Sequence, residues 1–148
     1  TNTLVPKIYK RFRLLEFHNV FTTSSPIIRD FIKATSSDIL KLFVPRGWFP
    51  PVTPGTRYVT IGGMLASDVH GKNHHISGSF SRHVLGFNLL TADGEIRWVD
   101  RQTDLKTFLA TAGGMGLTGA ILTIRFRMIP IKTSWISQKI YKIKTLTE

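Results

Sequence analysis

The clearest pattern of hydrophobic and polar positions lies in the stretch from Gly116 to Pro130. Its apolar positions fall on every second residue, with Thr or Arg between them: Leu122, Ile124, Phe126 and Met128. A period of two places successive side chains on opposite faces of a strand. The sequence therefore predicts a half-buried strand that ends near Pro130.

Two further runs that favour strands flank a short turn. Residues 84–91 form the first run, residues 95–99 form the second, and Ala92-Asp93-Gly94 separates them. An Asp-Gly pair between two such runs is a strong signal of a β-hairpin. Residues 58–61 are rich in β-branched side chains and predict another short strand, which ends at Gly62-Gly63.

Helix-start signals occur twice in the first third of the chain. Ser25 and Pro26 are typical of an N-cap and a first helical position. A helix there would place its apolar side chains on one face: Ile27, Ile28, Phe31 and Ile32. Ser37 is expected to cap a second helix, which Pro45 and Gly47 end.

Two later helices are predicted beside glycine pairs. Residues 64–69 suit one or two helical turns directly after Gly62-Gly63. Thr103 or Asp104 is expected to cap a helix that runs through Ala110 and stops at Gly113-Gly114.

These elements predict an α+β fold, with a mostly antiparallel sheet flanked by short helices. The 148 residues fit one domain, and a hydrophobic content of 42% is enough for a core. The chain has no cysteine, which excludes disulfides and thiolate metal ligands. Because neither a transmembrane run nor a signal-peptide pattern is seen, we expect a cytoplasmic protein or one peripheral at a membrane.

The formal net charge of +11 arises from 20 Lys and Arg against 9 Asp and Glu. Such a balance attracts anions such as nucleic acid, acidic lipid or a phosphorylated ligand. The basic residues gather towards both ends of the chain: Lys7, Lys10, Arg11, Arg13, Lys132, Lys139, Lys142 and Lys144. No zinc-finger, helix-turn-helix or RNP motif accompanies them, so we expect solvated surface and no nucleic-acid partner.

The candidate functional stretch runs from Pro54 to Phe80 and reads PGTRYVTIGGMLASDVHGKNHHISGSF. Glycines allow the backbone to approach a ligand closely, and His, Lys and Asn beside them supply polar contacts. If Gly62-Gly63 forms a strand-to-helix turn, free N–H groups there favour an anion or a carbonyl. The stretch therefore predicts a nucleotide or cofactor pocket.

Two other chemistries were weighed for the same stretch. His70, His74 and His75 could ligate zinc, but that spacing needs a helix, which Gly71 and Asn73 disfavour. We therefore expect no metal site. Ser77 and Ser79 beside histidines could suggest a hydrolase, but the G-x-S-x-G elbow is absent.

The stretch from Pro54 to Phe80, together with LLTADGEIRWV and ATAGGMGLTGAI, closely resembles the FAD-linked oxidases of the vanillyl-alcohol oxidase type. The run DVHGKNHH is the most specific part of this resemblance. The resemblance implies a PCMH-type FAD-binding domain with FAD as cofactor. It also implies a branch of the family that oxidises a sugar alcohol, a polyprenyl-phosphoryl pentose at its 2′-hydroxyl, by hydride transfer to flavin N5.

The resemblance also implies roles for individual residues. Those expected to contact the flavin, its diphosphate–ribityl chain or its adenine end are Gly55, Thr60, Ile61, Gly62, Gly63, Ser67, Asp68, Val69, His70 and Ile121. Lys72 is expected to reach the substrate pocket, and Lys72 and His70 are the implied catalytic residues. A reductase or epimerase partner and a peripheral contact with a membrane are further implications, the latter suited by the basic surface.

Some family features have no counterpart in this chain. The glycine-rich diphosphate loop P-R-G-x-G-x-S-x-G is missing, and Ser67 stands where some relatives carry cysteine. We therefore expect residues 36–131 to form the second FAD subdomain, residues 1–35 an unassigned basic segment, and residues 132–148 a basic tail or the start of a substrate domain. On this interpretation the chain is a fragment that alone binds FAD weakly or not at all. The alternative is a non-catalytic truncated paralogue that binds a partner through its basic surface.

Overall fold

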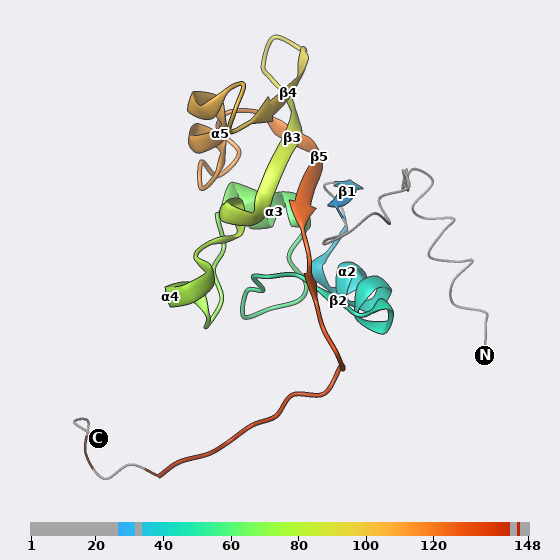
Figure 1. Ribbon diagram of the computed structural model, residues 1–148. Coiled ribbons are helices and arrows are strands. Elements are labelled where there is room, and N and C mark those ends of the chain that lie inside the picture. Colours follow the sequence, from blue (N-terminus) through green and yellow to red (C-terminus); the bar gives the residue numbers. More distant parts are fainter. Residues whose placement is uncertain (1–26, 32–33, 143–144, 146–148) are drawn as a thin grey trace.

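The computed structural model describes residues 27–31, 34–142 and 145. Within these residues, four antiparallel strands form one sheet in the order β1-β5-β3-β4 (Figure 1). The strands are β1 Ile27–Phe31, β3 Val84–Leu90, β4 Ile96–Asp100 and β5 Ala120–Arg127. Helices lie around this sheet, so the α+β class and the antiparallel pairing are confirmed.

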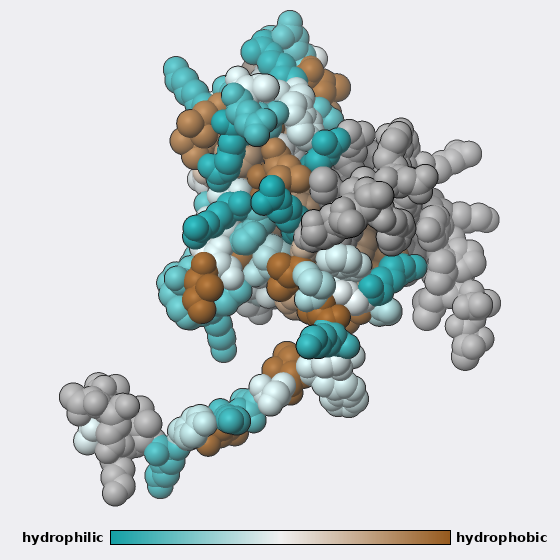
Figure 2. Space-filling view, in the orientation of Figure 1, coloured by the Kyte–Doolittle hydropathy of each residue, from teal (hydrophilic) through white to brown (hydrophobic). Residues whose placement is uncertain are grey.

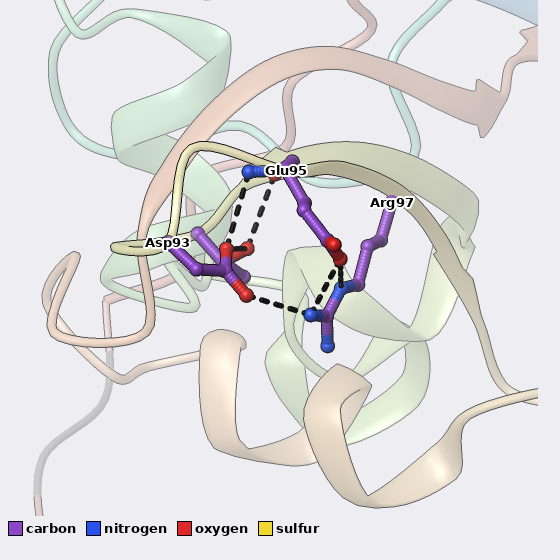
Figure 3. A network of polar contacts seen from close by, with 4 residues as sticks. Asp93, Glu95 and Arg97 are labelled. Atoms are coloured by element: carbon purple, nitrogen blue, oxygen red, sulfur yellow. Dashed lines mark hydrogen bonds and ion pairs between the residues drawn. The ribbon is translucent and has the colours of Figure 1, made fainter.

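The hairpin of β3 and β4 forms where Asp93-Gly94 predicted it, with Phe87 opposite Val99. Its turn carries a small polar network, shown in Figure 3: Arg97 Nη2 lies 2.7 Å from Asp93 Oδ2 and 2.7 Å from Glu95 Oε2. The hydrogen bond from the Thr91 hydroxyl holds the pKa of Asp93 below its usual value. All these side chains are exposed, so the network shapes the turn and adds little stability.

The alternation of β5 is confirmed from Ile124 onward, since Ile124, Phe126 and Met128 are buried. Leu122 departs from it. Asn88 pairs with Thr123 whereas Leu89 pairs with Ile121, so Leu122 is an extra residue in the ladder. Such a bulge shifts the side-chain phase by one position, and Ile121 becomes buried in place of Leu122.

Two predicted elements are wrong. Ile27–Phe31 is a strand and not a helix, because its backbone pairs with Arg127–Thr123 of β5; this pairing overrides the weak local preference. The capping pair Ser25-Pro26 lies outside the described residues. Residues 58–61 do not form a strand either, since Thr60 makes a single bridge with Thr35 and Ile61 already belongs to α3 Ile61–Ala66.

Side-chain caps begin two of the other helices. Thr35 and Asp38 form a reciprocal capping box at the start of α2 Ser36–Phe43, two residues before the predicted cap. The Asp104 carboxylate accepts from the Thr107 N–H at the start of α5 Leu105–Thr111, as predicted. The short elements that complete the fold are η1 Val44–Arg46, β2 Trp48–Phe49, α4 His74–Ser77, η2 Phe80–His83 and β6 Ile129–Pro130, of which β2 pairs with β6.

The core lies between the sheet and the helices α3 and α5. Phe87 of β3 packs on Phe108 of α5 with ring centroids 5.4 Å apart, and Phe80 packs on Phe126 at 5.3 Å. These rings and their neighbours are almost fully buried. In the described ranges no helix is long and apolar enough to cross a bilayer.

Residues 131–142 form neither a helix nor a strand and extend away from the rest of the molecule (Figure 1). Apolar and polar residues follow one another along this segment (Figure 2), and its large apolar side chains are exposed: Trp135, Ile136, Ile140 and Tyr141.

Candidate functional site

A groove with a volume of about 710 Å³ lies between the proline-rich segment 50–55 and the turn of residues 70–74. Its lining residues are Phe49, Pro50, Pro51, Thr53, Pro54, Gly55, His70, Gly71, Lys72, Asn73, His74 and Ile129. The fold thus brings three of the predicted site residues, Gly55, His70 and Lys72, to one groove. This volume is in the range of cofactor and ligand pockets.

Close backbone contact joins the two walls of this groove. A Cβ atom on Gly71 would lie 2.8 Å from the Thr53 carbonyl oxygen, so only glycine fits there. The Asn73 amide donates to the Pro51 carbonyl at 3.0 Å and to the Ser77 hydroxyl at 3.0 Å. Asn73, Pro51 and Thr53 therefore build the groove; sequence reasoning grouped Asn73 with the polar contacts of the stretch but did not select Pro51 or Thr53. The sequence signal for this contact was Asn73 itself, an amide side chain directly after the predicted site residue Lys72.

The groove carries positive and neutral polar groups on an otherwise apolar lining. Lys72 and His70 are exposed at its edge, and among the described residues no Asp or Glu lines it. The His70 and His74 rings lie 5.4 Å apart and tilted, and His74 meets His75 edge-on at 6.0 Å. The part of the chain that the structure describes holds no group of three or more His, Asp or Glu side chains that could share a metal ion. The groove therefore offers positive charge and apolar surface to a ligand.

Asp68 holds the backbone that precedes His70. Its Oδ2 accepts from the Ser79 hydroxyl at 2.8 Å and its Oδ1 from the Ser81 N–H at 2.8 Å. Ser79 in turn forms a β-bridge with His70. The carboxylate of Asp68 is therefore used within the chain. The backbone of Asp68 has a φ of 41°, which lies in the left-handed region that Asp tolerates better than most residues.

Of the N–H groups of the glycine pair that were predicted to be free, the one of Gly63 is occupied. Gly62 and Gly63 lie inside the first turn of α3, and the Gly63 N–H donates to the Thr60 hydroxyl at 3.1 Å. The Ile61 N–H donates to the Ala34 carbonyl at 2.8 Å. This prediction is therefore wrong for Gly63. Thr60 takes the N-cap role, so the helix begins at Ile61, three residues before the predicted start at Met64.

The loop after α5 reaches the opposite end of α3. The Gly113 N–H donates to the Leu65 carbonyl at 3.1 Å, and the Met115 N–H donates to the Ala66 carbonyl at 2.8 Å. These bonds satisfy carbonyls that a helix C-terminus leaves unpaired. Gly113 and Met115 therefore cap α3, and a Cβ on Gly113 would lie 3.6 Å from the Asp68 Cβ, so this loop lies beside Asp68.

The other predicted contact residues lie away from the groove lining. Ile61 is 2% exposed, Ile121 is 6% exposed within the core, and Val69 is half-buried. Ser67 is exposed at the C-terminal end of α3. The contacts of these four residues with the cofactor therefore stay predictions.

The chain is similar to known FAD-binding proteins. Residues 34–100 match the FAD binding domain family. A Streptomyces coelicolor protein described as an uncharacterized protein in the mprA 5′ region is 53% identical over 96 residues, which cover 65% of this chain and 26% of that protein. Decaprenylphosphoryl-beta-D-ribose oxidase of Mycolicibacterium smegmatis is 48% identical over 98 residues, or 66% of this chain and 21% of the oxidase.

More distant relatives extend the similarity over most of the chain. Cytokinin dehydrogenase 5 of Arabidopsis thaliana is 26% identical over 141 residues, which cover 88% of this chain and 26% of that protein. The chain thus spans about a quarter of the length of the curated relatives it matches. Residues 34–100, which contain the groove-forming segments 50–55 and 70–74, match the FAD binding domain family, and this match supports FAD as the cofactor.

Proposed function

We propose that the chain forms the second FAD subdomain of an FAD-dependent oxidoreductase that oxidises the 2′-hydroxyl of a polyprenyl-phosphoryl pentose. The observation that carries this proposal is the groove in which Gly55, His70 and Lys72 meet. The 48% identity to decaprenylphosphoryl-beta-D-ribose oxidase covers the same segment and supports the substrate class.

The groove residues fit a flavin. Phe49 and Pro54 offer apolar surface in the groove, and a Cβ on Gly55 would meet no described atom within 4 Å, so the backbone is bare there. The exposed ammonium of Lys72 supplies positive charge at the edge. FAD, when bound, supplies the hydride acceptor at N5.

The chain's own residues hold and orient the reactants in this proposal. Lys72 offsets negative charge on the reduced ring system or on the substrate phosphate. His70 would face the substrate, and the Asp68–Ser79 contact described above would hold its backbone in place. Asn73 fixes the turn that carries Lys72 by its bond to Pro51.

The proposal extends to partners that the chemistry requires. The oxidised product is a keto sugar, so a reductase must complete an epimerisation at that carbon. The exposed basic tail, with Lys132, Lys139 and Lys142, suits the anionic surface of a membrane that presents a lipid-linked substrate.

FAD titration of the chain tests the cofactor assignment. We expect weak but saturable quenching of flavin fluorescence, weakened about tenfold by Gly55→Val, because the valine side chain would project into the groove. Since Gly55 has open space at its Cβ, the melting temperature should stay unchanged. Tight stoichiometric binding would contradict the subdomain assignment, and no saturable binding at all would contradict the cofactor role of this segment.

A chimera tests the catalytic role of Lys72. The aligned 98 residues of the Mycolicibacterium smegmatis oxidase are replaced by those of this chain. We expect Lys72→Ala in the chimera to slow flavin reduction about a hundredfold, because it removes a positive charge at the reacting centre, with FAD content unchanged. Lys106→Ala on α5, also an exposed lysine, is the matched control. Equal rates of flavin reduction in the Lys72→Ala and Lys106→Ala chimeras would contradict a role of Lys72 in the substrate site.

A further inference from the structure

Helix α4 borders the groove but cannot hold its own shape. It has only four residues, His74–Ser77, whereas isolated helices shorter than about 12 residues are marginal in water. None of these four residues is buried, and no side chain caps the start of the helix. In Figure 1 the helix lies apart from the sheet. Contacts from outside the helix must therefore hold it in place.

Asn73 holds the helix from the side of the groove. Its amide donates one hydrogen to the Pro51 carbonyl and the other to the Ser77 hydroxyl, each at 3.0 Å. The amide oxygen lies close to Gly71, where an added Cβ would come within 2.9 Å of it. The Asn73 side chain therefore connects the last residue of α4 to the proline-rich wall of the groove.

His83 holds the same residue from the side of the sheet. Its Nε2 lies 2.9 Å from the Ser77 carbonyl oxygen. A carbonyl oxygen can only accept, so Nε2 carries the proton in this contact. Ser77 is thus held twice, by Asn73 at its hydroxyl and by His83 at its carbonyl.

The segment that carries His83 is fixed in the core. His83 ends η2, which begins with the fully buried Phe80 and leads directly into β3. Within η2, the Ser81 N–H donates to Asp68 Oδ1 at 2.8 Å, and the Ser81 carbonyl accepts from Arg101 Nη2 at 3.2 Å. His83 therefore gives the exposed helix α4 a contact with a rigid part of the fold.

We propose that His83 is a positioning residue for the groove: its bond to Ser77 fixes α4 and, with it, the turn that carries Lys72. His83 is not one of the described residues that line the groove, so it acts through this bond and not on a ligand. Its effect on a reaction rests on the proposed function, which places the reactants beside Lys72. The bond itself requires no ligand.

Nitrogen-15 NMR of the histidine rings tests the bond in the cofactor-free chain. We expect the Nε2 of His83 to carry a proton that exchanges slowly with water, because the Ser77 carbonyl holds it. A His83 ring whose Nε2 is unprotonated cannot donate to a carbonyl, and this result would overturn the proposal.

Hydrogen exchange of the α4 amides measures how far His83 fixes the helix. We expect His83→Ala to speed exchange of the Ser77 and Gly78 N–H groups, which close this helical turn, about tenfold. His83→Gln should restore most of the protection, because its side-chain amide can donate to the same carbonyl. His75→Ala removes an exposed imidazole from α4 itself and is the matched control, which should leave exchange unchanged. Wild-type exchange in His83→Ala overturns the proposal.

The melting temperature separates positioning of the groove from support of the core. Because α4 buries no residue, His83→Ala should lower the melting temperature by less than about 3 °C. A fall of about 10 °C would show that His83 stabilises the whole fold, and would overturn the proposal.

The chimera with the Mycolicibacterium smegmatis oxidase measures the consequence for the reaction. We expect His83→Ala to slow flavin reduction about tenfold at saturating substrate, because a small displacement of a group at the reacting centre is costly. FAD content should stay unchanged, and His83→Gln should recover most of the rate. A wild-type rate in the His83→Ala chimera contradicts the positioning role.

The two proposals fail separately in these experiments. A wild-type rate in the Lys72→Ala chimera would overturn the proposed function, while the His83 bond, measured without cofactor, would stand. Unchanged exchange of the α4 amides in His83→Ala would overturn the role of His83 alone, whether or not the chain binds FAD.

Discussion

Asp68→Ala is expected to lower the free energy of unfolding by about 3 kcal/mol. The substitution leaves the Ser81 N–H, in a residue only 6% exposed, without its acceptor and removes the acceptor of the Ser79 hydroxyl. It also leaves alanine at a φ of 41°, a conformation that costs alanine more than Asp. The measurement is chemical denaturation followed by fluorescence.

The same substitution should disturb the groove, because the Ser79 bridge that supports His70 loses its anchor. FAD affinity should therefore fall together with stability. Asp68→Asn keeps a side chain that tolerates this φ and one accepting oxygen, so its cost should be about 1 kcal/mol. Asp93→Ala, whose carboxylate bonds only exposed groups in the hairpin turn (Figure 3), should cost less still. A loss for Asp68→Ala no larger than that for Asp93→Ala would contradict the anchoring role.

Gly114→Ala is expected to cost about 3 kcal/mol and to lower the melting temperature by about 10 °C. Its Cβ would lie 2.0 Å from the Ala110 carbonyl oxygen, a backbone atom that no rotamer change can move. The loop must shift, and the bonds from Gly113 and Met115 to the C-terminal carbonyls of α3 are then lost. Differential scanning calorimetry measures the effect.

Gly116→Ala, two residues along the same loop, is the matched control. Gly116 has a φ of 83°, but among the described residues nothing lies within 4 Å of its Cβ position. Only backbone strain opposes alanine there, at about 1 kcal/mol. Equal losses at the two positions would show that strain, and not the contact with Ala110, decides the stability of this loop.

Local chemistry was sufficient for the elements whose signals lie within a few residues of each other. The Asp93-Gly94 turn, the Asp104 cap and the alternation from Ile124 to Met128 each depend on neighbouring side chains, and each is present in the structure. The resemblance carried by DVHGKNHH likewise needed only the order of residues, and the FAD binding domain match over residues 34–100 confirms the family.

Elements that depend on distant partners could not be predicted in this way. Ile27–Phe31 is a strand because β5, almost a hundred residues later, supplies its hydrogen bonds. Gly62 and Gly63 lie inside a helix because Thr60 caps it and Ala34 accepts from Ile61. Short segments have small intrinsic preferences, so such pairings decide their structure.

The sequence by itself determined the antiparallel α+β class, the FAD-binding family and the stretch that carries the site. These follow from hydrophobic periodicity, helix caps and sequence motifs, which are local properties of the chain. Only the tertiary structure decided that Gly55, His70 and Lys72 share a groove while Ile121 lies in the core. It alone showed that Asn73 and Gly71 join the groove walls. The physical reason is that burial and hydrogen-bond partnership are set by residues far apart in the chain.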